Sequence, residues 1–328
     1  MAIQVTQPTP GEPPLAIEVT GLPWTRAGGV SAIVQRSTDG GVRWTTVRGL
    51  ADVPVPPPPG LHLTGFAGDY ASTPDTAALD ITGDIDIRVD LTAGATEGIV
   101  VAKAAYDEPM EVSFDIYILS SGVAGLDWSP DGESVLSSES DPVPSLVSRQ
   151  RGTIRVTLDV DDENGHHVIT WYTGPTVDGP WTPLGEPQVV AGTTAIYASA
   201  KPLAVGAFSD GDAGISGVIH AVKILDGVDG TPVVDVRFDE QPSGTTEFED
   251  ATALPWTVHG NAEILTEPPI GARDWEFRPG VENRYRVGVH QILDRFDRYA
   301  EGAWGDATTG QTWLAQDPTE IIIVLDVE

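Results

Sequence analysis

Strict alternation of apolar and polar residues marks the end of the stretch from Leu61 to Leu91. Four apolar residues share one face there and four charged residues share the other, namely Ile85, Ile87, Val89 and Leu91 against Asp84, Asp86, Arg88 and Asp90. Successive side chains of a strand point to opposite faces, so this pattern predicts a strand with one face in a hydrophobic core and one in water. We interpret the acids at 84, 86 and 90 as a solvated outer face rather than a binding site.

Further strands are predicted by the same periodicity over the next two hundred residues. The predicted strands are 98–104, 112–118, 123–128, 153–160, 167–173, 203–208, 217–225, 233–238, 256–260 and 262–265. The segment 133–147 is rich in Ser, Pro and acid, and we expect a long surface loop there. Roughly a dozen strands with frequent turn signals indicate a β-sandwich or jelly roll with almost no helix.

The two ends of the chain carry a second, smaller strand pattern. Strands are predicted over 15–22, 30–35 and 43–47, and Asp39-Gly40 marks a tight hairpin turn between the last two. This arrangement is typical of the middle of an immunoglobulin-like or fibronectin III-like sandwich, which needs about seven strands. Too few strands precede residue 53, but more are predicted over 274–277 and 284–289.

Two Pro-rich segments, 53–59 and 266–269, separate these patterns and suit the joints of an inserted domain. We therefore expect one sandwich split between residues 1–55 and 270–328, with a larger sandwich inserted at 60–265. The sequence also suggests an extended arm over 1–14 and a short helix over 291–300. The apolar run 320–328 requires a partner strand, in the split sandwich or in another subunit.

The charge balance limits the partners. Eighteen Lys and Arg stand against 49 Asp and Glu, which gives a formal charge of -31. Such a surface repels phosphate, so nucleic acid and anionic membranes are poor partners. A solvated acidic surface, cation association and docking to a basic partner remain open.

Targeting and redox signals are few. There are no cysteines, which excludes disulfides and thiolate metal sites. No window of 18 consecutive apolar residues predicts membrane insertion. The opening residues MAIQVTQPTPGEPP lack the basic start and apolar run of a signal peptide.

No catalytic carboxylate set is found, so we do not expect an enzyme. A retaining glycosidase on a sandwich fold would gather paired carboxylates, for example as Glu-x-Asp-x-x-Glu along one strand. The nearest match begins at Glu139 and Asp141 but has Pro144 in the third position.

Calcium is the one cofactor for which candidates exist. The run Asp159 to Gly165 resembles a calcium loop, but Asn164 and Thr170 stand where an EF-hand needs Gly and Glu. Asp210 and Asp212 are the better pair, and they are either cation ligands or part of a solvated turn. Adjacent strand residues point to opposite faces, so His166 and His167 cannot share one metal.

Four aromatic residues are candidates for stacking on sugar rings. Trp128 and Trp181 lie beside predicted turns, and Tyr106 and Tyr172 lie near predicted strand ends or turns. The alternative for each is core filling, which we expect of Trp171 within its strand.

Three motifs in order resemble the concanavalin A-like (laminin-G-like) jelly roll of actinobacteriophage minor tail proteins. They are GDYASTPDTAALDITGDIDIRVDL, GIVVAKA and VVDVRFDEQPSGTTEFEDATALPWTVHGNAEI, within residues 60–265. The flanking STDGGVRWTTVRG, WEFRPGVENRYRV and TWLAQDP resemble the fibronectin-like element of those proteins.

The resemblance implies an all-β virion component at or near the tail tip, made in the host cytoplasm. Its expected partners are other phage tail proteins, further copies of itself as a homo-oligomer, and a host cell-surface glycan bound by the jelly roll. Structural decoration is the other role that the family allows. The alternatives are a secreted carbohydrate-binding or adhesion module, and a glycoside hydrolase.

Overall fold

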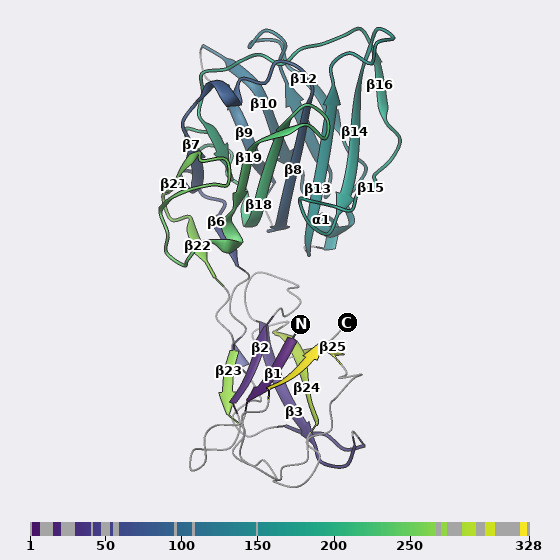
Figure 1. Cartoon of the computed structure of the whole chain (residues 1–328), viewed down its shortest axis with the longest axis vertical. Coiled ribbons are helices and arrows are strands. Elements are labelled where there is room, and N and C mark those ends of the chain that lie inside the picture. Colours follow the sequence, from purple (N-terminus) through teal and green to yellow (C-terminus); the bar gives the residue numbers. More distant parts are fainter. Residues whose placement is uncertain are drawn as a thin grey trace. The chain divides into compact units, whose positions relative to one another are not determined.

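Two compact units make up the chain in the computed structural model, one of residues 58–266 and one of residues 1–57 with 267–328 (Figure 1). The structure describes residues 2–6, 16–20, 30–40, 42–46, 53–54, 59–94, 97–106, 109–148, 150–266, 270–273, 284–292, 299–305 and 322–326. Nearly all regular elements in these ranges are strands, which confirms the all-β prediction. No helix in these ranges is long and apolar enough to cross a membrane.

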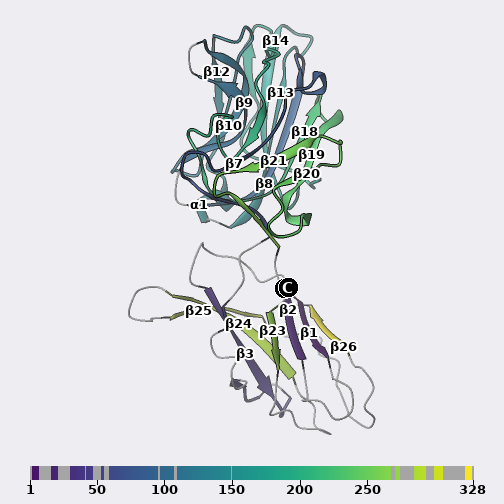
Figure 2. The same ribbon diagram turned by 90° about the vertical axis from the view of Figure 1, so that its left-hand side faces the viewer.

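The smaller unit is a pair of sheets built from both ends of the chain (Figure 2). Its strands are β1 (Ala2–Thr6), β2 (Ala16–Thr20), β3 (Val30–Ser37), β4 (Thr45–Thr46), β5 (Val53–Pro54), β23 (Ile270–Arg273), β24 (Arg284–Ile292), β25 (Tyr299–Gly305) and β26 (Ile322–Asp326). One sheet has the order β23-β2-β1-β26, and the other has β25-β24-β3-β4 with β5 also on β3. Since β2 pairs with β23 and β3 pairs with β24, each sheet needs strands from both ends.

Three expectations for the ends of the chain can be compared with these strands. The segment predicted as an extended arm contains β1, which pairs with β2 and β26. The apolar C-terminal run therefore finds its partner strand within the split sandwich. The helix predicted over 291–300 is wrong, because Ile292 and Tyr299 pair as strand residues of β24 and β25. Cross-strand pairing with β3 and β25 overrides the helical spacing there.

The larger unit is a sandwich of two antiparallel sheets. Sheet I has the order β15-β14-β13-β8-β18-β6-β22, with β16 also on β14 and β19 also on β18. Its strands are β6 (Gly60–Thr64), β8 (Ile85–Ala93), β13 (Arg151–Asp159), β14 (His166–Gly174), β15 (Thr182–Pro183), β16 (Gln188–Ala191), β18 (Ser216–Asp226), β19 (Thr231–Arg237) and β22 (Glu263–Leu265).

Sheet II has the order β12-β11-β10-β9-β17-β7-β21-β20. Its strands are β7 (Tyr70–Thr73), β9 (Gly98–Ala105), β10 (Glu111–Ile118), β11 (Ala124–Trp128), β12 (Leu136–Glu139), β17 (Leu203–Val205), β20 (Glu247–Glu249) and β21 (Pro255–His259). The helices are short: η1 (Ala77–Leu79), η2 (Phe238–Glu240) and α1 (Pro144–Ser148). The segment 133–147, predicted as a loop, thus holds β12 and most of α1.

The core lies between the two sheets and fixes which residues of sheet II face outward. One row of paired residues crosses the sheet and belongs to the core, namely Ala71, Val205, Val101, Ile116 and Leu126. Side chains alternate along each strand, so the rows on either side of this one face away from the core. One outer row holds Ser72, Ala204, Ala102, Asp115, Asp127 and Ser137. On the other side of the core row lie two separate runs, His259 with Tyr70, and Ile99 with Tyr117, Gly125 and Glu139, because the β9–β10 register shifts between Ile116 and Tyr117.

Candidate functional site

The outer face of sheet II gathers tyrosines and carboxylates at the end formed by β10, β11 and β12. Asp115 pairs directly with Asp127, and Tyr117 pairs with Gly125, which in turn pairs with Glu139. Directly paired residues have Cβ atoms about 5 Å apart. Together with Tyr106, which follows β9, these residues form what we call the sheet II patch: Tyr106, Asp115, Tyr117, Asp127 and Glu139.

Tyr117 lies flat across the neighbouring strand. A Cβ built on Gly125 would come within 2.0 Å of Tyr117 Cζ, so the ring occupies the space above that glycine. The ring is partly exposed, as is Asp127, and Glu139 is exposed. Burial, and then the charges of Asp127 and Glu139, raise the pKa of Tyr117 to about 12, so its hydroxyl keeps its proton at neutral pH.

Asp115 is the buried member of the patch. The Tyr106 hydroxyl donates a hydrogen bond to Asp115 Oδ2 at 2.7 Å, and the Tyr106 ring contacts Phe208 at a centroid distance of 5.2 Å. Only 1% of Asp115 is exposed, against 37% of Tyr106. Burial and the nearby Asp127 raise the pKa of Asp115 to about 7, although the bond from Tyr106 acts in the opposite direction.

Asp127 has one carboxylate oxygen that accepts no hydrogen bond from the residues that the structure describes. Its Oδ1 is buried and has no hydrogen-bond partner. Burial raises the pKa of Asp127, and the Glu139 charge adds to the rise, while a hydrogen bond from Ser137 opposes it. Carboxylate oxygens accept hydrogen bonds, and the negative face of an aromatic ring attracts polarised C–H groups. The buried Asp127 Oδ1 is out of reach of a ligand, but the exposed Glu139 carboxylate and the partly exposed Tyr117 ring can hold one that offers hydroxyl donors beside a C–H face.

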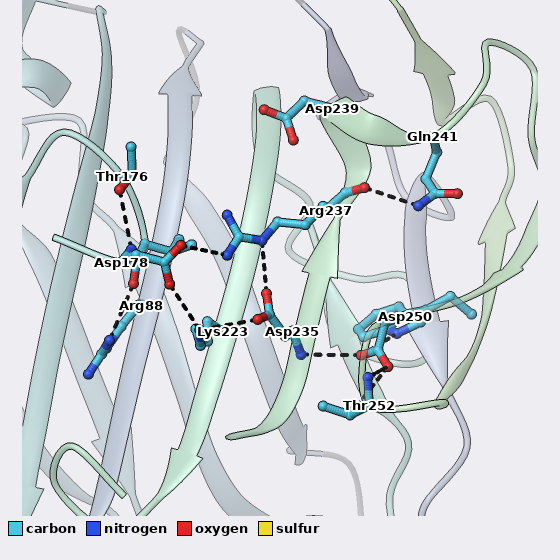
Figure 3. A network of polar contacts seen from close by, with 12 residues as sticks. Arg88, Thr176, Asp178, Lys223, Asp235, Arg237, Asp239, Gln241, Asp250 and Thr252 are labelled. Atoms are coloured by element: carbon cyan, nitrogen blue, oxygen red, sulfur yellow. Dashed lines mark hydrogen bonds and ion pairs between the residues drawn. The ribbon is translucent and has the colours of Figure 1, made fainter. Parts of the chain in front are cut away.

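The outer face of sheet I is occupied by ion pairs instead. Asp86 accepts bidentate hydrogen bonds from Arg88 and from Arg155, and Asp229 pairs with both guanidinium groups at 2.8 Å. Asp178 and Asp235 each pair with Lys223 and Arg237 in a second part of this network (Figure 3). These ion pairs fix the loops over the sheet, and each charged group named here has partners of opposite charge.

The interpretation of the acids on β8 as a solvated face is wrong for two of the three. Asp86 is 0% exposed and Asp90 is 2% exposed, and Arg88 between them is also buried. The segment that holds Val177 and Trp181 covers Arg88, since Arg88 Nη1 donates to Val177 O and the Arg88 guanidinium lies 5.4 Å from the Trp181 ring. Asp90 forms an ion pair with Arg151 at 2.7 Å.

The structure places the four aromatic candidates in three different environments. Trp128 is a correction: it is only 2% exposed, faces the core and donates its indole N–H to Thr194 Oγ1, so no sugar can stack on it. Trp181 and Tyr172 are partly exposed on sheet I, where the Arg155 guanidinium lies 5.4 Å and 4.9 Å from their rings. Tyr106 belongs to the sheet II patch.

The calcium candidates lie in an exposed turn. Asp210 Oδ1 accepts the backbone N–H of Asp212 at 3.0 Å, which closes that turn. Within the ranges that the structure describes, no group of three or more His, Cys, Asp or Glu residues could hold a metal ion.

Sequence reasoning missed Asp115, Tyr117 and Asp127. The signal was present, since all three alternate with apolar residues that lie in the core, namely Phe114, Ile116 and Leu126. What one strand cannot show is the cross-strand register that sets Asp115 beside Asp127 and Tyr117 over Gly125.

Basic side chains of the larger unit are already paired. Between Pro58 and Thr266 there are 8 Lys and Arg against 33 Asp and Glu. All seven of the basic residues described there form ion pairs, namely Arg88, Lys103, Arg151, Arg155, Lys201, Lys223 and Arg237. An anionic ligand would find no uncommitted cation among them.

Comparisons with known proteins agree with the fold class. No protein-family model matches the sequence, and no curated protein matches it either. Solved structures that resemble the chain include the carbohydrate-binding module CBM40 of the Ruminococcus gnavus IT-sialidase bound to α2,3-sialyllactose, with 13% identity over 51% of this chain and 91% of that one (TM-score 0.37). A protein from Bacteroides ovatus described as carbohydrate-binding has 11% identity over 82% of this chain and 89% of its own (TM-score 0.39).

The heptameric SAP-like pentraxin of Limulus polyphemus has 12% identity over 60% of this chain and 77% of its own (TM-score 0.29). The class of the larger unit, a two-sheet antiparallel β-sandwich, follows from its own strand order. With TM-scores below 0.5, the solved structures carry no argument about the ligand of this chain.

Proposed function

We propose that this protein is a glycan-binding module whose ligand site is the sheet II patch. The observation that supports this function is the Tyr117 ring lying flat over Gly125, with Asp127 and Glu139 on the neighbouring strands. A sugar ring has an apolar C–H face for the tyrosine and hydroxyl donors for the carboxylates.

The chemistry of the patch favours a neutral glycan. Three carboxyl groups lie in it, and every described cation of the larger unit is engaged in an ion pair. A sialylated or uronic acid-rich glycan would bring further negative charge to an acidic face without a counter-charge. Neutral hexoses and N-acetylhexosamines avoid that repulsion.

A glycan array with the full-length protein tests this function. We expect binding to a set of neutral glycans and loss of that binding in Tyr117→Ala. Removing a half-buried tyrosine platform costs about 1.5–3 kcal/mol, which is roughly a 10- to 100-fold weaker Kd.

Tyr197→Ala is the matched control. Tyr197 also packs its ring against a glycine, Gly132, but lies outside the sheet II patch. The Tyr197→Ala variant should bind glycans like the wild type. If Trp181→Ala lost binding while folded and Tyr117→Ala kept it, the site would be on sheet I and the assignment would be wrong.

We propose binding without hydrolysis. Glycoside hydrolysis needs two carboxyl groups that both reach the scissile bond. Asp115 is buried and its Oδ2 holds the Tyr106 hydroxyl, which leaves Asp127 and Glu139 as the accessible acids. Release of reducing ends from any glycan that binds on the array would contradict this.

We further propose that the module belongs to a phage tail. The support is the motif resemblance over residues 60–265 and its flanks, together with the split sandwich in which β1 and β26 pair. In that arrangement the jelly roll is an excursion from an anchoring domain. Mass spectrometry of purified virions should detect the chain, and its absence from intact particles would refute the assignment to a phage tail.

A further inference from the structure

A second cluster of polar and aromatic groups lies on the outer face of sheet II, on β7 and β21. The His259 ring stacks on Tyr70 with a centroid distance of 4.4 Å and an angle of 22° between the rings. His259 Nε2 and Ser72 Oγ are 2.8 Å apart and share a hydrogen bond. All three residues are partly exposed.

Strand register puts this cluster on the same face as the sheet II patch. Ser72 pairs with Ala204, which pairs with Ala102, which pairs with Asp115. Tyr70 precedes Ala71 and Tyr117 follows Ile116, two residues that belong to the core row, so both tyrosines also lie next to that row. Between Ser72 and Asp115 the row consists of Ala204 and Ala102, which are fully buried, so side chains from other segments lie over this part of the row.

Aromatic groups continue across the strands between them. Tyr106 follows β9 and Phe208 follows β17, and their rings are in contact. The order across sheet II is therefore Tyr117 on β10, the Tyr106–Phe208 pair, and the Tyr70–His259 stack on β7 and β21. Such a series offers repeated platforms to a chain of rings, whereas a single sugar needs only one.

The separation fits an oligosaccharide. Strands β7 and β10 are three strand spacings apart, which is about 14 Å. A short run of linked pyranose rings covers that distance. Such a ligand would lie across the strands, with one ring on Tyr117 and another against the Tyr70–His259 stack.

We propose that Tyr70, Ser72 and His259 form a second subsite, so that the ligand is an extended neutral oligosaccharide rather than a terminal sugar. This inference rests on the glycan-binding function proposed above and specifies the length and direction of its ligand. The Ser72 hydroxyl and the His259 ring supply hydrogen bonds, and Tyr70 supports the imidazole from behind.

Chain-length dependence tests the second subsite. Calorimetric titrations of the full-length protein with cello-, malto- and N-acetylchito-oligosaccharides, each from disaccharide to hexasaccharide, measure affinity against length. We expect affinity to rise about tenfold between the disaccharide and the tetrasaccharide in one of these series. His259→Ala and Ser72→Ala should bind the disaccharide like the wild type and lose that rise.

The outcomes separate the two proposals. Tyr117→Ala should weaken every length, because its platform serves all of them. If affinity is independent of length, or if both Ser72→Ala and His259→Ala keep the rise, the second subsite is wrong while the glycan-binding function stands. If the wild type binds none of the three series, both are overturned. Intrinsic tryptophan fluorescence, to which the buried Trp256 on the same strand as His259 contributes, reports whether a variant is folded.

Discussion

The buried carboxyl group of Asp115 provides a quantitative prediction about the sheet II patch. Its pKa of about 7 lies well above its ordinary value of 3.8. Below about pH 3 the group is protonated in the folded and the unfolded protein, so it makes no pH-dependent contribution to stability. As the pH rises to about 7, the unfolded chain releases the proton while the folded protein retains it, so the stability contributed by the neutral form is progressively lost.

The size of the effect follows from the same pKa. A difference of about three pH units at 1.36 kcal/mol per unit gives an upper value of roughly 4 kcal/mol. Asp115 and Asp127 titrate as a pair, so part of this is shared, and we expect on the order of 2–4 kcal/mol. Asp115→Asn cannot ionise and keeps an oxygen for the Tyr106 hydroxyl. Its stability relative to the wild type should therefore rise by that amount between about pH 4 and pH 8.

Urea unfolding of the full-length protein, followed by fluorescence of the buried tryptophans, measures this difference at each pH. The matched control is Asp131→Asn. Asp131 is exposed in a turn, and backbone hydrogen bonds from Ser134 and Glu133 lower its pKa to about 2. Its difference from the wild type should therefore not change above about pH 5. A pH-independent difference for Asp115→Asn would refute the buried acid pair.

Three further predictions concern packing, charge and domain structure. Gly125→Ala should displace the Tyr117 ring, because the new Cβ would lie 2.0 Å from Cζ, and it should abolish glycan binding in the same array; retained binding would contradict the platform. Asp86→Asn should lower the free energy of unfolding by about 3–5 kcal/mol, because Arg88 and Arg155 lose their shared buried partner. Asp229→Asn, whose side chain is 67% exposed, should cost less than about 1 kcal/mol, and equal costs would argue against burial as the cause. A fragment of residues 58–266 should show the near-ultraviolet circular dichroism of a folded sandwich, whereas residues 1–57 alone should not fold, since β2 and β3 pair with β23 and β24.

The sequence predicted the strands well because alternation directly reflects which side chains face the core. Ile85, Ile87, Val89 and Leu91 are all buried in the core, and so is Trp171, as expected. Whether the residues on the opposite face of that strand are buried or exposed could not be predicted in this way. Periodicity shows that Asp86 and Asp90 point away from the core, but it contains nothing about the loops and basic residues that then cover them.

The aromatic candidates show a second limit. Trp128 was assigned to a rim because a turn follows it, yet it alternates with Leu126 and Ala124 and therefore faces the core. Tyr117 and Asp127 were overlooked because a binding patch on a sheet is formed by residues of neighbouring strands. The register between β10 and β11 decides which of these residues lie side by side, and no local motif encodes that register. On the other side of β10, the pairing with β9 is irregular between Val112 and Phe114 and between Ile116 and Tyr117.

The most direct test of the glycan-binding site is hydrogen–deuterium exchange of the full-length protein with and without a neutral oligosaccharide that binds on the array. We expect slower exchange in β10, β11 and β12, next to Tyr117, Asp127 and Glu139, and no change in β8, β13 and β14 of sheet I. Protection confined to sheet I, over the Trp181 loop, would contradict the assignment of the site to sheet II.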